Sequence, residues 1–353
     1  MQLGFWENKK VLLTGHTGFK GTWMTMLLKE LGAQVAGFSL PLEEASFYRK
    51  VKANVDYHFE GDIRSKIDIG KVFGQFEPEV LFHFASHSSL HKSDKIPDYI
   101  LGTNIMGLVH LLEEVRLHSS VKAAVIVTSD KCYKDTDKPG GYDESCQLWA
   151  DNPYSVSKVC QEIISECYRK TFFENPGRIN LATARASNVI AYGDYNLTRL
   201  IPYAVDCYLR GSKAVIRNPH AIRPWQYVLD VLWGYLLLAQ KLYCNYGLSA
   251  QYNGAYNFGP TANTFAEVCE IMDIISGLFG TMNHCYDGQP AKETKILKLD
   301  STKARRELEW KPLYSLERMV RETVQIARQG MEGLDVGHIC RSIVRDYLTE
   351  VNS

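Results

Sequence analysis

Short apolar runs alternate with longer amphipathic segments through the first half of the chain. Six runs have the length and the apolar composition of buried strands. They are Lys10–Thr14, Gln34–Ser39, Tyr57–Phe59, Val80–Ala85, Ala123–Val127 and Ile179–Ala186. Segments with helical spacing lie between them, and one of these runs from about Tyr99 to Val115. The alternation predicts an α/β protein with a doubly wound parallel sheet, whose ligands lie at the carboxyl ends of the strands.

Beyond Ile190 this regular alternation gives way to shorter pieces. We expect helices at 200–209, 228–242 and 301–308 and in the last part of the chain, with short strands at 214–216 and 256–258. The sequence therefore predicts a smaller C-terminal α/β substrate-binding lobe. We place the dinucleotide-binding domain at residues 1–188, with parts of 226–260 returning to it, and mainly the substrate lobe at 189–353.

Composition narrows the class of protein. The 353 residues carry 40 basic and 40 acidic side chains, so their net charge gives no reason to expect nucleic acid or an anionic membrane as partner. The longest nearly apolar segment, Val231–Ala239, is far shorter than the roughly 20 residues of a membrane span. No secretory signal is recognisable at the N-terminus. The nine cysteines show no CxxC pair, so we expect no disulfide framework and no metal. A cytoplasmic enzyme of small molecules fits these properties.

The first predicted strand ends in a glycine-rich turn, Gly15-His16-Thr17-Gly18-Phe19-Lys20-Gly21, directly before a helix. This GxxGxxG spacing permits a tight turn, a close backbone approach to a pyrophosphate and free N–H groups at the helix start. The pattern also occurs in ordinary loops, but its place in the first strand-turn-helix unit favours a dinucleotide site of Rossmann type. The second strand ends without the acidic residue that binds an adenosine ribose. The sequence therefore does not distinguish between NAD and NADP as the cofactor.

Polar residues mark other strand ends. Asp62 follows the third strand and could accept a hydrogen bond from an adenine amino group, or could cap the helix that begins near Ser65. His83 lies inside the apolar fourth strand, where a core histidine is the simpler interpretation. Asn104 is the polar exception on the helix that follows.

The strongest chemical signal lies between Val125 and Lys158. The fifth strand ends at Ser129, and the helix after Pro153 carries Tyr154 and Lys158 four residues apart, on one face. An ammonium group near a phenol lowers the phenol pKa and can hold a nicotinamide ribose, which makes the tyrosine a usable general base. With a serine hydroxyl beside it to share the proton of a substrate alcohol, this pattern predicts a hydride-transfer site.

Asp130 and Lys131 follow Ser129 directly and suggest a second step. Once carbon 4 of a sugar is a ketone, the proton on carbon 5 becomes acidic, and a nearby acid and base can expel the hydroxyl of carbon 6 as water. The alternative is that Asp130 caps the loop and Lys131 points to solvent. The residues alone do not decide between the two.

These motifs resemble the extended short-chain dehydrogenases/reductases, and specifically the CDP-glucose 4,6-dehydratases, over nearly the whole chain. The most specific match is the triplet Ser129-Asp130-Lys131, where related dTDP-glucose dehydratases have Thr-Asp-Glu. The other matching segments are Phe5-Trp6, 15–21, 103–107, 132–133, 154–158, 216–226 and 257–260.

The resemblance implies that bound NAD takes a hydride from carbon 4 with Tyr154 as base, assisted by Ser129 and Lys158, and is regenerated when carbon 6 is reduced. Asp130 and Lys131 would then manage the loss of water. It also implies a nucleotide-sugar substrate and a homodimer built through the helices that bear Asn104 and Tyr154. We expect cofactor contacts from Gly15, His16, Thr17, Gly18, Phe19, Lys20, Asp62, Ile63, Phe84, Ala85, Asn104, Tyr154 and Lys158. We expect substrate contacts from His87, Asn188, Arg199, Arg217 and Arg223.

Two segments depart from the family pattern. His87 and His91 replace a glutamine and an arginine after the fourth strand, and the segment Ala191–Asn196 replaces a Gly-Gly-Gly-Asp-Trp-Ala run, with Thr198 in place of an acid. Because these positions line the sugar and phosphate region in relatives, the nucleotide and the sugar stay open. The alternatives are a sugar-nucleotide epimerase, a dehydratase of another nucleotide sugar and a non-catalytic NAD(P)-binding sensor.

Overall fold

A seven-stranded parallel sheet forms the centre of the computed structural model, which describes residues 3–88, 93–136, 138, 140–174, 178–261, 264–287 and 298–353. The strand order is β11-β6-β5-β4-β1-β2-β3. The bounds are β1 Lys10–Thr14, β2 Gln34–Ser39, β3 Tyr57–Glu60, β4 Val80–His83, β5 Ala123–Val127, β6 Asn180–Ala186 and β11 Gly254–Phe258. All six predicted strands are present, so the predicted doubly wound sheet is confirmed. The fourth ends two residues early, at His83, whose Nδ1 lies 2.7 Å from Thr14 Oγ1 in the core.

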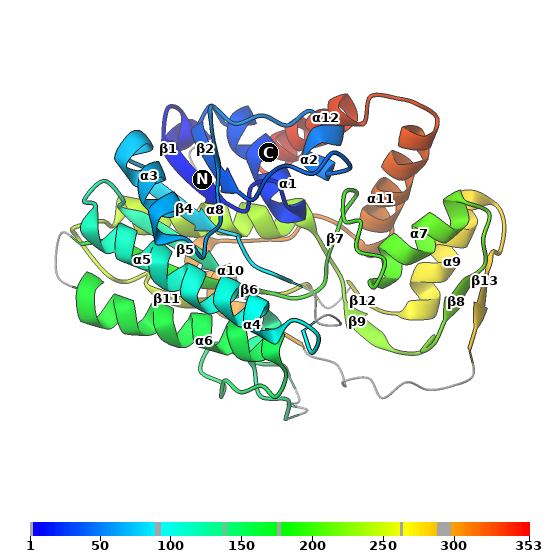
Figure 1. The fold of residues 1–353 in the computed structure, drawn as a ribbon. Coiled ribbons are helices and arrows are strands. Elements are labelled where there is room, and N and C mark those ends of the chain that lie inside the picture. The colour runs from blue at the N-terminus through cyan, green and yellow to red at the C-terminus, as the bar shows by residue number, and fades with distance from the viewer. Residues whose placement is uncertain are drawn as a thin grey trace.

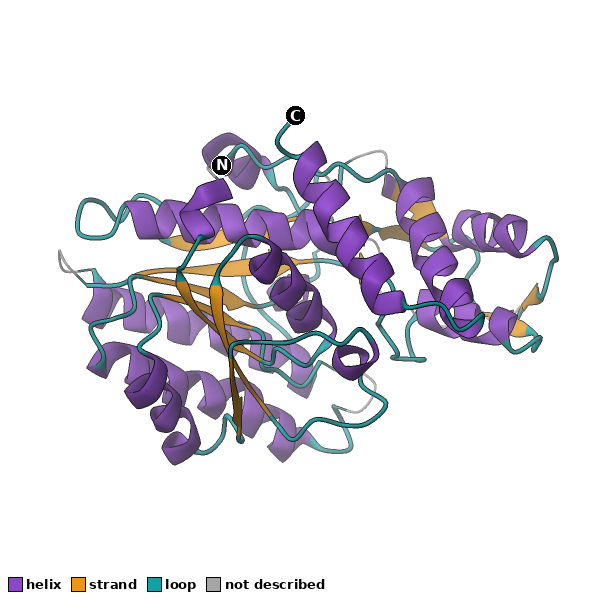
Figure 2. Cartoon of the chain, turned by 90° about the horizontal axis from the view of Figure 1, so that it is seen from above, coloured by secondary structure: helices purple, strands orange, loops and turns teal. Residues whose placement is uncertain are grey.

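Helices cover both faces of this sheet (Figures 1 and 2). Successive residues of β1 point to opposite faces, so Leu12 joins one buried cluster while Val11 and Leu13 join the other. The first cluster includes α3 (Lys66–Phe76) and α5 (Gly107–Leu117), with α6 (Pro153–Tyr168) packed against it. The second includes α1 (Phe19–Glu30), α8 (Val228–Cys244) and α12 (Val336–Glu350).

The predicted helix near 99–115 is continuous but not uniform. It begins as α4 (Pro97–Leu101), passes through a π-helical turn, η3 (Gly102–Met106), and continues as α5. Helix α6 likewise runs on into a π turn, η5 (Arg169–Phe173). Asn104 lies in the first of these wider turns and is fully buried. The remaining short elements of this part are η1 Leu3–Trp6, α2 Phe47–Lys50 and η4 Asp130–Cys132.

The smaller lobe lies beside the carboxyl edge of the sheet (Figure 1). Its helices are α7 (Leu200–Leu209), α9 (Val268–Phe279) and α11 (Leu316–Met331). Three short strand pairs accompany them: β7 Val189–Ile190 with β10 Gln226–Tyr227, β8 Ala214–Ile216 with β13 His284–Tyr286, and β9 Ile222–Pro224 with β12 Phe265–Glu267. Helix α10 (Thr302–Leu308) lies against α8 and β11.

A segment that follows the first elements of the smaller lobe returns to the main sheet. Strand β11 pairs in parallel with β6, from Gly254 opposite Ala182 to Phe258 opposite Ala186. Asp230, which interrupts the apolar sequence of α8, is buried and accepts hydrogen bonds from Leu313 N, Tyr314 N and Tyr347 Oη. This carboxylate therefore ties α8 to the segments before α11 and within α12. Within the described residues, no helix is long and apolar enough to cross a membrane.

Candidate active site

The glycine turn after β1 is shaped for close backbone approaches. Gly15 has φ +74°, and a Cβ there would lie 2.7 Å from Ala85 N; a Cβ on Gly21 would lie 2.2 Å from Gly15 O. Gly18 is the N-cap of α1 and offers no side chain to the N–H groups of the first helical turn. These N–H groups and the positive end of the helix dipole suit a phosphate. The turn therefore fits the pyrophosphate of a dinucleotide.

The neighbouring histidine supports the turn from inside. His16 is buried, its Nε2 lies 3.0 Å from His58 Nδ1, and its ring fills the space that a Cβ on Gly37 would need. Burial and the neighbouring His58 lower the pKa of His16 to about 4, so the ring is neutral at physiological pH. Its side chain thus packs between β1 and β2, while the backbone belongs to the turn.

The end of β3 rules out one of the two alternatives considered for Asp62, the cap of the next helix. Ser65 caps α3, because its hydroxyl accepts from Asp68 N over 3.3 Å. Asp62 instead accepts from Arg64 N over 2.9 Å and forms an ion pair of 2.6 Å with the Arg64 guanidinium, which holds the Asp62 pKa below its ordinary value. The Ile63 side chain is buried against Gly107 of α5. Whether these residues meet an adenine stays a prediction.

Asn104 uses its side chain to join three segments. Its Oδ1 accepts from Ser86 Oγ over 3.1 Å and from His87 N over 2.8 Å, and its Nδ2 donates to Ser157 Oγ over 2.8 Å. The loop after β4, with Ala85 against the glycine turn and His87 against the ring of Tyr99, is thereby fixed to η3 and α6. His91, the second departure in this loop, lies outside the described residues.

The loop after β5 places the predicted dehydration pair beside the serine. Ser129 Oγ donates to Asp130 Oδ1 over 2.9 Å and accepts from Lys131 N, so the serine and not the aspartate caps η4. Asp130 is buried, and its Oδ2 lies 3.7 Å from Lys131 Nζ. The capping aspartate of the alternative is therefore wrong, whereas the Lys131 side chain lies beside Asp130 and is still 33% exposed.

Helix α6 brings Tyr154 and Lys158 to the same place. Asn152 caps the helix by accepting from Ser155 N, and Pro153 occupies its first turn. Lys158 Nζ lies 6.0 Å from the centroid of the Tyr154 ring and donates to Gln161 Oε1 over 2.9 Å. Burial and the charge of Lys20 lower the Lys158 pKa to about 7.

The predicted effect on the tyrosine is wrong for this structure. The pKa of Tyr154 is raised, because burial outweighs the hydrogen bond between Tyr154 and the Ser129 hydroxyl and the positive charge of Arg199. A lysine with a pKa near 7 carries only part of a charge at neutral pH, so its help to the phenolate is weaker than a fully charged ammonium would give. Spacing alone could not reveal that Lys158 is buried and Tyr154 is partly buried.

Basic residues from three segments converge on the same edge. The pKa of Lys20 on α1 is lowered to about 8 by burial and by the charge of Arg199, and the charges of Asp130 and Asp194 oppose this. Lys20 also acts on Lys158, and Arg199 Nη1 pairs with Asp194 Oδ2 over 2.7 Å. Such a cluster of cations favours anion binding.

The other predicted substrate residues come from the smaller lobe and its junction with the sheet. Asn188 follows β6, and its main-chain oxygen accepts from Gln226 N over 3.1 Å. Arg217 follows β8 and is exposed, and Arg223 is half-buried on β9. The substrate contacts expected of Arg217 and Arg223 stay predictions.

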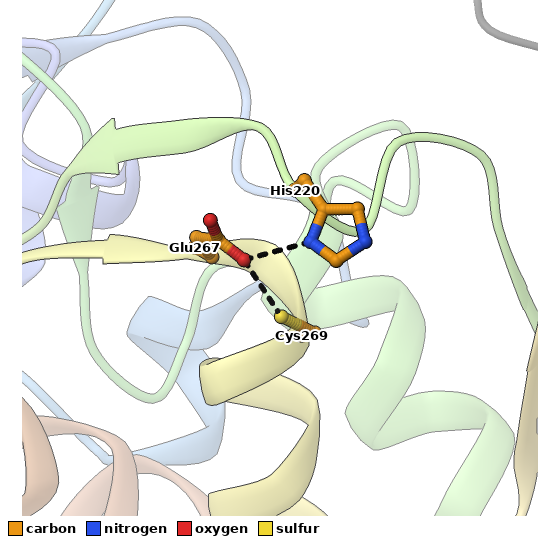
Figure 3. A group of neighbouring side chains, drawn as sticks. All are labelled: His220, Glu267 and Cys269. Carbon is orange, nitrogen blue, oxygen red and sulfur yellow. Dashed lines mark hydrogen bonds and ion pairs between the residues drawn. The ribbon is translucent and has the colours of Figure 1, made fainter.

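Three potential metal ligands meet where β9 and α9 approach each other (Figure 3). Glu267 Oε2 accepts from His220 Nδ1 over 2.8 Å and from Cys269 Sγ over 3.2 Å. The three side chains thus satisfy one another, at the positive N-terminal end of α9, where a cation is disfavoured. Main-chain hydrogen bonds from Val268 N and Cys269 N to the 219–221 loop also hold the start of α9 against this loop.

Sequence reasoning missed a buried polar network behind Thr128. Glu162 accepts from Thr128 Oγ1 over 2.5 Å and from Thr183 Oγ1 over 2.7 Å, and pairs with Arg185 over 2.8 Å. Arg185 also donates to Tyr133 Oη over 2.6 Å. The available signal was a glutamate four residues after Lys158, on the face of α6 that packs against the sheet.

Comparisons with known proteins agree with this geometry. The sequence profile described as GDP-mannose 4,6 dehydratase matches residues 12–323. The CDP-glucose 4,6-dehydratase of Salmonella typhimurium is 36% identical, with 98% of each chain covered. The UDP-glucose 4-epimerase of Pisum sativum is 26% identical, over 90% of this chain and 95% of its own.

Solved structures show the same architecture. The dTDP-glucose 4,6-dehydratase of Bacillus anthracis, in complex with NAD, has a TM-score of 0.76 and 26% identity over 92% of this chain and 98% of its own. The UDP-glucose 4-epimerase of Thermotoga maritima, with UDP-glucose, has a TM-score of 0.78 and 23% identity over 91% and 99%, and shows the fold alone.

Proposed function

The chain belongs to the GDP-mannose 4,6 dehydratase family, and on this premise we propose that it is an NAD-dependent nucleotide-sugar 4,6-dehydratase, a hydro-lyase. We propose CDP-D-glucose as substrate and CDP-4-keto-6-deoxy-D-glucose as product. The 36% identity to a CDP-glucose 4,6-dehydratase over nearly the full length supports this choice. The observation that carries the reaction type is the Ser129-Asp130-Lys131 loop beside Tyr154, with Ser129 and Asp130 buried and Lys131 partly exposed.

NAD is the cofactor, and the turn at residues 15–21 with the free first turn of α1 would hold its pyrophosphate. When bound, NAD accepts a hydride from carbon 4 of the sugar and returns it to carbon 6 within one turnover. Lys158, with its Nζ at the end of β5, is placed to bind ribose hydroxyls.

Proton movement is assigned to the residues around Ser129. Tyr154 removes the proton of the carbon 4 hydroxyl. The Ser129 hydroxyl lies between Tyr154 and Asp130 and binds the oxygen of the carbon 4 hydroxyl. Positive charge from Arg199 favours the phenolate and opposes the effect of burial.

Elimination of water is assigned to Asp130 and Lys131. One of them removes the proton from carbon 5, the bond from carbon 6 to its hydroxyl breaks, and the other protonates the departing oxygen. The 3.7 Å between Asp130 Oδ2 and Lys131 Nζ keeps an acid and a base side by side. An epimerase needs no such pair, which is why the dehydratase is preferred.

Substrate binding is proposed for the cation cluster and the smaller lobe. Lys20 and Arg199 would attract the diphosphate, with Asn188, Arg217, Arg223 and His87 completing the nucleotide and sugar contacts. In this proposal residues 1–188, with parts of 226–260, bind the cofactor, and the rest of 189–353 mainly binds the nucleotide sugar.

We also propose a cytoplasmic homodimer built through the helices that bear Asn104 and Tyr154. Exposed large apolar side chains on these helices support the interface: Met106, Leu117, Ile163 and Phe172. Light scattering coupled to size exclusion tests the assembly, and a monomer at micromolar concentration would refute it.

The reaction is tested by incubating the purified protein and NAD with a panel of nucleotide sugars and measuring product mass. Loss of one water from CDP-glucose is the expected result. An unchanged mass with a new isomer would indicate an epimerase, and turnover of another nucleotide sugar alone would refute the CDP assignment. NAD binding with no turnover of any sugar would favour a non-catalytic sensor. Asp130→Asn serves as a control that should stop water loss while NAD binding persists.

A further inference from the structure

Lys158 is held by a second residue on its own helix. Its Nζ donates to Gln161 Oε1 over 2.9 Å, and Gln161 Nε2 donates to the main-chain oxygen of Asn104, also over 2.9 Å. Gln161 is completely buried, and Lys158 is 3% exposed. The glutamine amide therefore bridges α6 and η3, with both of its polar ends in use.

The main-chain acceptor of this bridge lies in an unusual turn. Asn104 is in the middle of η3, where the Gly107 N–H bonds back five residues to Gly102 O. A π turn inside an α-helix shifts the usual pairing of main-chain carbonyls, and such turns are frequent at functional sites. Buried carbonyl groups need a partner. Asn104 O finds one in Gln161, and its side chain is held by Ser157.

Gln161 offers Lys158 an acceptor without charge. The nearest carboxylate on α6, Glu162, is already bound by Arg185 and two threonine hydroxyls. The titratable groups that act on Lys158 or lie beside it are Lys20 of α1, Glu162 and Tyr154 of α6, Cys132 of η4 and His83 of β4. A carboxylate in place of the amide would form an ion pair with the ammonium. Its negative charge would then offset the effect of the lysine charge on Tyr154.

We propose that Gln161 is the positioning residue of the active site, which holds Lys158 Nζ between the end of β5 and the π turn and leaves the lysine charge available to Tyr154. The amide orients the amine, because Oε1 accepts from it while Nε2 is anchored on Asn104 O. This inference rests on the proposed function only in giving Lys158 a catalytic task. The contacts themselves do not depend on the substrate.

Two substitutions separate orientation from charge. Gln161→Glu retains the size and the acceptor but adds a negative charge, so Lys158 should titrate about 1–3 pH units higher. Gln161→Leu has a similar volume and removes both hydrogen bonds, so Lys158 should titrate no higher than in the parent protein. Ser165→Ala is the matched control, since Ser165 is buried on the same helix and its Oγ has no partner among the described residues.

The primary measurement is an NMR titration of protein labelled with ¹³Cε-lysine, in which the Lys158 signal is identified by its loss in Lys158→Met. A higher midpoint in Gln161→Glu, with Ser165→Ala unchanged, supports the proposal. An unchanged Lys158 midpoint in Gln161→Glu would overturn it, because the side chain at position 161 would then not contact Lys158 Nζ. The titration requires no turnover, so it decides the role of Gln161 even if no nucleotide sugar reacts.

Kinetics provide the second measurement in the protein with NAD. Gln161→Leu should lower kcat about 10- to 100-fold while KM for the nucleotide sugar stays constant, because the residue touches the lysine and not the sugar. In Gln161→Glu the acid limb of the pH profile should move to higher pH. A rise in KM with unchanged kcat would contradict a positioning role. Absence of activity in the parent protein would refute the proposed function instead.

Discussion

The buried ion pair between Glu162 and Arg185 should be essential for stability. Both side chains are only 4% exposed, and burial would by itself raise the Glu162 pKa, yet Arg185 and two threonine hydroxyls hold it below the ordinary value. Glu162→Ala leaves the Arg185 guanidinium buried without its anion. Breaking one partner of a buried pair costs about 3–5 kcal/mol.

This cost converts into a measurable shift of the melting temperature. An unfolding entropy of about 2.1 cal/mol/K per residue gives about 0.74 kcal/mol/K for a chain of this length, so Tm should fall by about 4–7 °C. Differential scanning calorimetry of the purified protein, without added NAD, measures it directly. Thr183→Val, which removes only one hydroxyl bond to the same carboxylate, should cost about 1 kcal/mol.

The double variant Glu162→Met/Arg185→Met is the decisive comparison. It removes both charges and fills the space with apolar groups, so it should be more stable than Glu162→Ala. A double variant whose loss equals the sum of the two single losses would refute the reasoning, because the residues would then not be coupled. A loss below about 1 kcal/mol in Glu162→Ala would refute it as well.

Three further predictions concern the cofactor turn and two buried titratable groups. Gly21→Ala should weaken NAD binding at least about tenfold, since its Cβ would lie 2.2 Å from Gly15 O. Gly18→Ala should weaken binding less, because its Cβ would lie 3.3 Å from the same atom. Equal NAD affinities of the two variants in a fluorescence titration would contradict this. Lys158 has a folded pKa lowered to about 7, so stability falls as pH falls from its unfolded pKa of about 10.4 to 7, and the Tm advantage of Lys158→Met over the parent should grow from pH 9 to pH 7 and then level off. Asp230 has a folded pKa raised to about 6, so its contribution is lost as pH rises through 6, and the Tm of the parent minus that of Asp230→Asn should decrease from pH 4 to pH 7. A pH-independent difference in either series would contradict the corresponding assignment.

Local pattern was sufficient for most of the sheet. Each of the six predicted strands is a short apolar run next to a turn, and alternation with helices determines that the strands are parallel. Parallel strands place their carboxyl ends at one edge, so the loop at Ser129 and the glycine turn at Gly15 could be assigned to one site before any coordinates. The clustering of Tyr154 and Lys158 followed from helical spacing.

Partner choice could not be predicted in the same way. Asp62 pairs with Arg64 and Asn104 binds the loop after β4, partners that the sequence pattern did not indicate, and the cofactor contacts expected of both residues stay predictions. Both side chains can form several alternative hydrogen bonds, and the energies of these bonds differ by about 1 kcal/mol. The packing of neighbouring segments decides among such alternatives.

The sequence by itself determined the order of strands and helices, the glycine turn and the residue types at the active site, because these depend on local periodicity and spacing. Only the tertiary structure decided that β11 pairs with β6, that Gln161 binds Lys158 and that Glu162 meets Arg185, 23 residues away. It also decided the sign of the Tyr154 pKa shift. The physical reason is burial, since the cost of charge and the value of a partner depend on the surroundings that distant segments create.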